Sequence, residues 1–219
     1  MDFQFTPYML PFAGAAFVLA LLLHVAWNNR RDPVARWFAA TLGALTIWAV
    51  GYCLEISVIG AQEKILFANI QFLGVATVPV CWWEMSRRYL DLRKIPKIVT
   101  VALWLVTVAT IIVAFTNPGH VFRGMPSIII GEAPFPVLHG DYGPWYSWVL
   151  LPETGVLNAL VLFLLARATI RAKRFRRRQF VLLFFALFVP LLGANRFREA
   201  TESPSESPRA KTTPVMMLQ

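Results

Sequence analysis

The feature of this sequence that most restricts its fold is the spacing of its charged residues. The charges are gathered into short clusters, and apolar stretches of roughly 20 residues separate them, the length that an α-helix needs to cross about 30 Å of hydrocarbon. A hydrophobic content of 57% and a charged content of 15% leave too little polar surface for a soluble domain. Helices satisfy their own backbone groups and can therefore span lipid. The sequence thus predicts an all-α, polytopic transmembrane helical bundle.

Six apolar segments are candidate membrane-spanning helices. Their expected limits are residues 8–27, 37–59, 65–85, 98–115, 145–166 and 179–194. The sixth segment is at the short limit for a spanning helix. Residues 195–219 switch abruptly to a composition rich in Ser, Pro, Glu and Arg, which is typical of disorder, and we interpret this tail as the product of a frameshift or truncation.

The basic residues predict the orientation of the helices. The loops after the first, third and fifth segments carry three, five and seven Lys or Arg, whereas the other two loops carry only Lys64 and Arg123. Cytoplasmic loops of membrane proteins are the basic ones, so we expect the N-terminus outside and a multi-pass protein of the plasma membrane. The same clustering indicates that the net charge of +9 faces the lipid bilayer and its anionic head groups, and does not bind nucleic acid.

Four polar residues at similar depth are the candidate ligand-binding residues. Glu55 lies near the outer end of the second segment, Asn69 and Gln71 lie in the third, and Glu153 lies in the outer half of the fifth. Ionisable groups inside a membrane are costly and therefore functional candidates. The four could line a cavity open to the outside that senses a small ligand or a proton. The alternative is that they only join helices through hydrogen bonds.

A second polar group lies at the other end of the third segment. Glu84 precedes Arg87 and Arg88 by three and four residues, so all three side chains share one helix face. This spacing predicts a structural ion pair.

The sequence contains no pattern from which catalysis or metal binding would be expected. Its three histidines lack a metal-binding spacing, and nothing resembles a Ser/His/Asp triad or a glycine-rich phosphate loop. We therefore predict no catalytic residue, no metal site and no cofactor. A small secondary transporter or channel subunit remains the alternative function, because prolines within helices and intramembrane carboxylates also occur there, although no internal repeat is visible.

Several residues together carry a resemblance to a known family. They are Trp48 and Glu55; Gln71, Gly74, Pro79, Trp82, Trp83 and Tyr89; Asn117, His120, Val121 and Phe122; residues 142–145; and Arg178, Gln179 and residues 190–195. In this order and spacing, the chain from about residue 8 to 195 resembles the N-terminal seven-helix membrane sensor region of bacterial and archaeal histidine kinases.

The resemblance implies a membrane sensor or input module that responds to a small ligand or a membrane signal. Its partners would be cytoplasmic signalling domains or a second copy of the chain. The sequence departs from the family pattern because it stops before a seventh helix and has no phosphoacceptor or ATP-binding portion. We therefore expect this polypeptide not to be an enzyme.

Overall fold

The structure is a computed structural model that describes residues 2–92, 95–124, 127–129, 137–139 and 141–171. Its long helices are α1 (Leu10–Asn28), α2 (Pro33–Ser57), α3 (Ala61–Tyr89), α4 (Lys97–Thr116) and α5 (Leu151–Arg171). A 3-10 turn, η1 (Pro7–Met9), precedes α1, and a π-helical turn, η3 (Tyr146–Leu150), precedes α5. Five helical segments in the described part of the chain are long and apolar enough to cross a membrane. The predicted fold class, a polytopic transmembrane helical bundle, is confirmed.

The helices extend beyond the apolar segments. Helix α2 begins at Pro33, four residues earlier than expected, because the Asp32 carboxylate accepts a hydrogen bond from the Val34 amide at 3.1 Å and Pro33 fits the first helical turn. Helix α3 extends past the apolar segment at both ends and includes the polar residues Glu63, Arg87 and Arg88. Hydropathy therefore marks the part of each helix that crosses lipid, not the whole helix.

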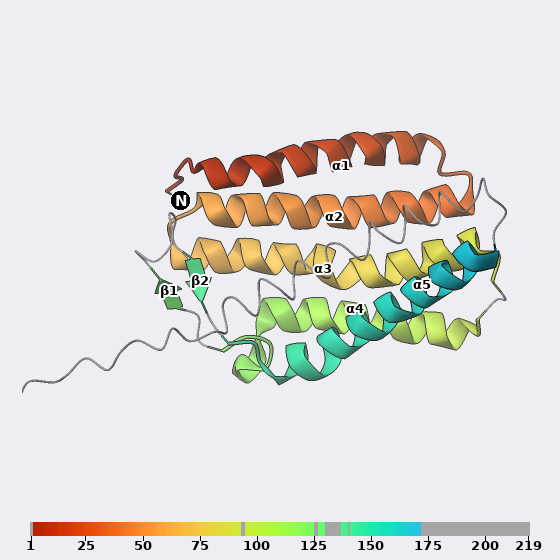
Figure 1. The fold of residues 1–219 in the computed structure, drawn as a ribbon. Helices are drawn as coiled ribbons and strands as arrows, with labels where there is room; N and C mark the ends of the chain where they lie inside the picture. Colours follow the sequence, from red (N-terminus) through yellow and green to blue (C-terminus); the bar gives the residue numbers. More distant parts are fainter. Residues whose placement is uncertain (1, 93–94, 125–126, 130–136, 140, 172–219) are drawn as a thin grey trace, which may run out of the picture. The chain divides into compact units, whose positions relative to one another are not determined.

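Consecutive helices from α1 to α4 pack side by side and antiparallel (Figure 1). Helices α2 and α3 approach most closely at two glycines. A Cβ atom on Gly74 of α3 would lie 2.3 Å from the Ala44 carbonyl oxygen, and one on Gly51 of α2 would lie 2.8 Å from Cγ of Gln71. Small residues at helix contacts allow this approach in membrane proteins, where van der Waals packing drives association.

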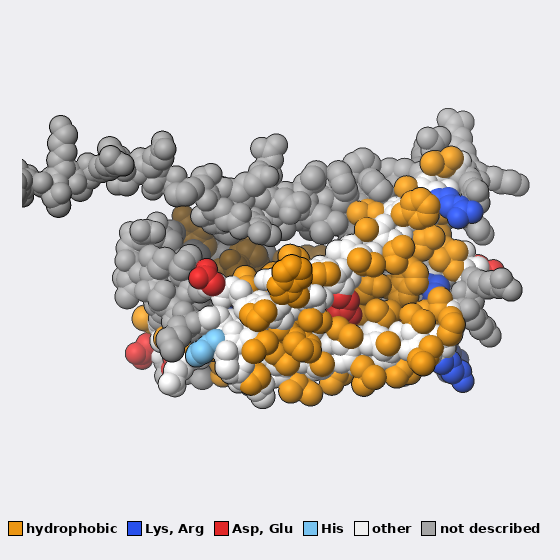
Figure 2. Space-filling model, turned by 90° about the horizontal axis from the view of Figure 1, so that it is seen from below, with side chains coloured by type: hydrophobic (Ala, Val, Ile, Leu, Met, Phe, Trp, Pro, Cys, Tyr) orange, Lys and Arg blue, Asp and Glu red, His pale blue; other side chains and the backbone are white. Residues whose placement is uncertain are grey.

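The outer surface of the bundle is apolar. Large hydrophobic side chains point outward from several helices, including Phe17, Val25, Ile98, Val101, Leu105 and Phe163. Figure 2 shows hydrophobic side chains covering most of the described part of one face, with Lys and Arg gathered at one end. Such a surface is suited to lipid and would be exposed at high cost to water.

The two ends of the bundle differ in charge and structure. At the basic end, α1 and α3 end and α2 and α4 begin, and this end carries Arg30, Arg31, Arg36, Arg87, Arg88 and Lys97. At the opposite end, which we call the hairpin end, two short strands, β1 (Ser127–Ile129) and β2 (Val137–His139), pair antiparallel (Figure 1). There the Gln4 amide also donates to the Ser57 carbonyl, which joins the N-terminal segment to the end of α2.

Residues 1–164 form one compact unit, and residues 165–171, the last turns of α5, belong to a second unit. The predicted sixth helix, residues 179–194, and the predicted tail, residues 195–219, lie outside the described residues.

We predict that Gly74→Ala destabilises the protein by about 1 to 3 kcal/mol, because the added methyl group must push apart backbones that are already in contact. Thermal unfolding of the purified protein in detergent measures this. The matched control is Gly14→Ala in α1, where an added Cβ has no atom within 4 Å. An equal loss in both variants would show that the close α2–α3 contact is not what Gly74 supplies.

Candidate functional site

Glu55 of α2 and Gln71 of α3 meet at the hairpin end of the bundle. The amide nitrogen of Gln71 donates a hydrogen bond to Oε2 of Glu55. Side chains in a helix tilt toward its N-terminus, and α2 and α3 run in opposite directions, so these two side chains lean toward one another. Gly51, one turn before Glu55, leaves room for Gln71. The carboxylate therefore has a fixed donor from the neighbouring helix.

Lys64, in the first turns of α3, is the second member of this site. Its side chain is only 1% exposed, and Nζ donates a hydrogen bond of 2.7 Å to the backbone carbonyl of Glu55. Carbonyls in the last turn of a helix lack partners within the helix, and a cation satisfies them well. The positive charge of Lys64 also acts on the Glu55 carboxylate. Lys64 thus joins the end of α2 to the start of α3.

The segment after α4 folds back over this region because Asn117 organises it. Asn117 adopts a left-handed conformation with φ 39°, and its side-chain oxygen accepts hydrogen bonds from the amides of Phe122 and Arg123, both at 3.0 Å. Its side-chain nitrogen donates to the Arg123 carbonyl at 2.8 Å. Asparagine tolerates this conformation better than most residues. These bonds fix the position of Arg123.

Residues just before η3 also bind the segment after α4, through backbone hydrogen bonds. The Gly143 amide donates to the Phe122 carbonyl at 2.8 Å, and the Trp145 amide donates to the Val121 carbonyl at 3.0 Å. A Cβ on Gly143 would lie 2.2 Å from the Val121 carbonyl oxygen, so only glycine fits. The indole nitrogen of Trp145 donates to the Thr110 hydroxyl of α4 at 3.1 Å. We call residues 117–124 and 141–145 the clamp.

The clamp brings a third charge to the site. Arg123 is 7% exposed, and its guanidinium lies 5.8 Å from the centre of the Phe72 ring of α3. Phe72 in turn packs edge-on against the fully buried Phe122, with ring centres 4.7 Å apart. Burial lowers the pKa of Arg123, while the charge of Glu55 opposes this shift. The site therefore places one carboxylate among two buried cations that come from different parts of the chain.

The four residues predicted from the sequence do not form one group. The structure joins Glu55 and Gln71, whereas no hydrogen bond among the described residues joins Asn69 or Glu153 to either of them. Asn69 is buried two positions before Gln71, and side chains with that spacing leave a helix on different faces. Oε1 of Glu153 is buried without a hydrogen-bond partner among the described residues. Ligand binding by the four, and the cavity open to the outside, stay predictions.

Lys64 and Arg123 were not among the residues predicted for the site. The sequence nevertheless contained an indication of their role. Lys64 and Arg123 are the only two Lys or Arg residues in the loops expected outside, and Glu55 lies close to the same end of the second segment. A buried carboxylate requires a counter-charge, so those two residues were the available partners.

At the basic end, the predicted ion pair is confirmed. Nη2 of Arg87 lies 2.8 Å from Oε2 of Glu84, and Arg88 bonds to the same carboxylate oxygen. The Arg88 guanidinium also lies 4.9 Å from the centre of the Trp37 ring of α2. The Arg88–Trp37 contact therefore joins the end of α3 to the start of α2.

Comparison with known proteins gives one match. The model of the family described as the N-terminal 7TM region of histidine kinase matches residues 10–214. No curated protein and no solved structure matches the chain.

We predict that Glu55 and Arg123 are coupled. Glu55→Gln should lower the free energy of unfolding by about 3 kcal/mol, because two buried cations lose their counter-charge. Arg123→Gln should lower the free energy of unfolding by about 1 kcal/mol less in the Glu55→Gln variant than in the unchanged protein. Denaturant titration of the single and double variants measures this difference. The matched control pair is Glu153→Gln with Arg123→Gln, for which the losses in free energy of unfolding should add. If the losses also add for Glu55→Gln with Arg123→Gln, the two residues are not coupled.

Proposed function

Because this chain belongs to the family of N-terminal 7TM regions of histidine kinases, we propose that it is a sensor whose stimulus acts on the polar site at the hairpin end. The observation that carries the proposal is the set of contacts at this end: Lys64 and Gln71 bind Glu55 and so join α2 to α3, and Arg123 and Phe122 pack on Phe72 and so join α3 to the clamp. A stimulus that binds or neutralises one of these charges changes the stability of the whole contact.

The proposed mechanism is a shift between two arrangements of the helices. In one arrangement the clamp is docked on α3, with Arg123 and Phe122 against Phe72, as in this structure. In the other the contact is broken, and α3 and α4 are free to move relative to each other. A stimulus shifts the balance only as far as its affinities for the two arrangements differ. Helices α3 and α4 then carry the change to the basic end, where cytoplasmic signalling domains would receive it.

This mechanism requires the hairpin end outside and the basic end in the cytoplasm. We predict that, in a background lacking Cys53 and Cys81, Gln62→Cys is labelled in intact cells by a membrane-impermeant maleimide, whereas Arg31→Cys is labelled only after permeabilisation. Both positions are exposed and lie at opposite ends of the bundle. The physical reason is that loops with many Lys and Arg are retained in the cytoplasm. The reverse pattern would invert the proposed direction of signalling.

The signalling role is tested by joining the full chain to the catalytic part of a histidine kinase and measuring phosphotransfer without stimulus. Glu55→Gln and Arg123→Gln break the same contact, so both should change the basal output in the same direction, by about fivefold or more. Glu153→Gln, which removes an intramembrane carboxylate outside the contact, should change it much less.

The transporter alternative gives different results in two measurements. It requires solute or ion flux when the chain is reconstituted into vesicles, and it predicts that output of the fusion is indifferent to the Glu55 and Arg123 variants. Flux that is abolished by Glu55→Gln would replace the sensor proposal.

A further inference from the structure

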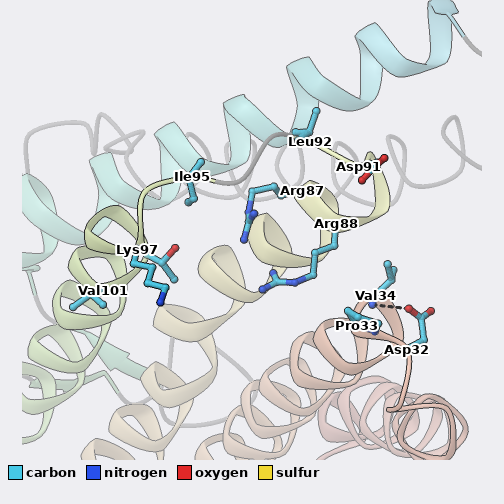
Figure 3. Close-up of a pocket in the computed structure, with 11 residues that line it drawn as sticks. Asp32, Pro33, Val34, Arg87, Arg88, Asp91, Leu92, Ile95, Lys97 and Val101 are labelled. Atoms are coloured by element: carbon cyan, nitrogen blue, oxygen red, sulfur yellow. Dashed lines mark hydrogen bonds between the residues drawn. The ribbon is translucent and has the colours of Figure 1, made fainter.

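A cavity of about 790 Å³ opens at the basic end, far along the bundle from the polar site of the hairpin end. The start of α2, the end of α3 and the start of α4 form it (Figure 3). Its charged lining residues are Asp32, Arg87, Arg88, Asp91 and Lys97, and its apolar ones are Pro33, Val34, Leu92, Ile95 and Val101. A cavity of this size is typical of a site for a small molecule.

One side of the cavity is suited to a phosphate group. Lys97 is the first residue of α4, whose N-terminal amides have no side-chain cap and whose first turn contains no acid. A helix N-terminus and an adjacent Lys together attract phosphate. Arg87 also lines the cavity, and its guanidinium is held in place by the ion pair of Nη2 with Glu84.

The other side of the cavity is acidic. Figure 3 shows Asp32 and Asp91 on the side away from Lys97, with Arg88 between them and Arg87. Among the described residues, the positive charges of Arg87, Arg88 and Lys97 are matched by the negative charges of Asp32, Asp91 and Glu84, and Glu84 binds both arginines. The described part of the lining is therefore close to neutral and would not favour a simple anion. Separate positive and negative sides instead match a ligand that carries both charges.

The apolar lining indicates where such a ligand comes from. Val101 lines the cavity and is also 55% exposed on the outer surface, next to Ile98 at 76%. The cavity is thus continuous with the surface of α4 that faces lipid, so acyl chains could follow α4 while the head group enters the cavity. A soluble phosphate ester would gain nothing from this surface.

We propose that this cavity binds the phosphoethanolamine head group of a membrane lipid. The phosphate lies against Lys97 and the start of α4, with Arg87 beside it, and the amine lies against Asp32 and Asp91. Because the ligand joins the ends of α3 and α4, it stabilises the arrangement of helices in which the cavity is formed.

The test uses the full chain purified in detergent. Native mass spectrometry measures retention of phosphatidylethanolamine, phosphatidylcholine and phosphatidylglycerol, and a melting curve measures the stabilisation by each. We expect phosphatidylethanolamine to be retained most and to raise the melting temperature most. Phosphatidylcholine keeps the phosphate but has no N–H donor for the aspartates, and phosphatidylglycerol has no cation. Equal retention of all three would overturn the proposal, whatever the variants show.

Three variants locate the site. Lys97→Gln should weaken binding of phosphatidylethanolamine about fivefold, the effect of one cation near a head group. Asp91→Asn keeps the side-chain shape at a position with φ 49° and should reduce the preference over phosphatidylcholine. Arg31→Gln removes an exposed cation of the same end that does not line the cavity and should have no effect. An effect of Arg31→Gln equal to that of Lys97→Gln would show general attraction to the basic end and contradict the site.

Water-soluble glycerophosphoethanolamine distinguishes the source of the head group. If the lipid is the ligand, this compound should neither stabilise the protein nor displace the lipid at millimolar concentration. Stabilisation by the soluble compound that Lys97→Gln abolishes would overturn the lipid assignment in favour of a soluble ligand. The outcome is independent of the sensor proposal, because none of these variants touches Glu55, Lys64 or Arg123.

Discussion

The interior of a bilayer offers polar groups no hydrogen-bond partner, and the rest of this structure depends on that constraint. The backbone meets it by forming helices. The side chain of Glu55 cannot, so the chain supplies Gln71, Lys64 and Arg123 around it. Bringing Arg123 there requires a segment after α4 that turns back sharply, which explains why Asn117 is left-handed and why Gly143 can have no side chain. A single half-buried carboxylate thus accounts for much of the fold at the hairpin end.

The sequence was sufficient for the parts that depend on local spacing. Apolar segments predicted the spanning helices, and the three- and four-residue spacing from Glu84 predicted its ion pairs with Arg87 and Arg88. Helix limits were less accurate, because a cap such as Asp32 starts a helix outside the apolar segment. Side chains tilt toward the N-terminus of their own helix, so Glu55 and Gln71 lean toward one another across the antiparallel pair and form their hydrogen bond.

The sequence was insufficient where contacts join distant segments. Nothing local to Arg123 indicates that it lies on Phe72, because that contact depends on the bonds of Asn117 and on the close approach at Gly143. Conversely, Asn69 and Glu153 were grouped with Glu55 by depth alone. Whether two side chains meet depends on their depth in the bundle and also on the helix face from which each one projects. Asn69 lies two positions from Gln71, so the two side chains leave α3 on different faces, and a role for Asn69 in ligand binding stays a prediction.

The two polar sites lie at opposite ends of one helix, and this arrangement limits how a signal can pass between them. Helix α3 carries Gln71 near the hairpin end and Glu84 near the basic end, and Pro79 lies inside the helix between them. A proline removes one backbone hydrogen bond, here the one to the Val75 carbonyl, so the helix bends there at least cost. Before Pro79, α3 is held close to α2 at Gly74, and at its basic end Arg88 holds it to Trp37. A change at the clamp therefore alters the angle between two anchored halves of α3 more easily than it translates the whole helix.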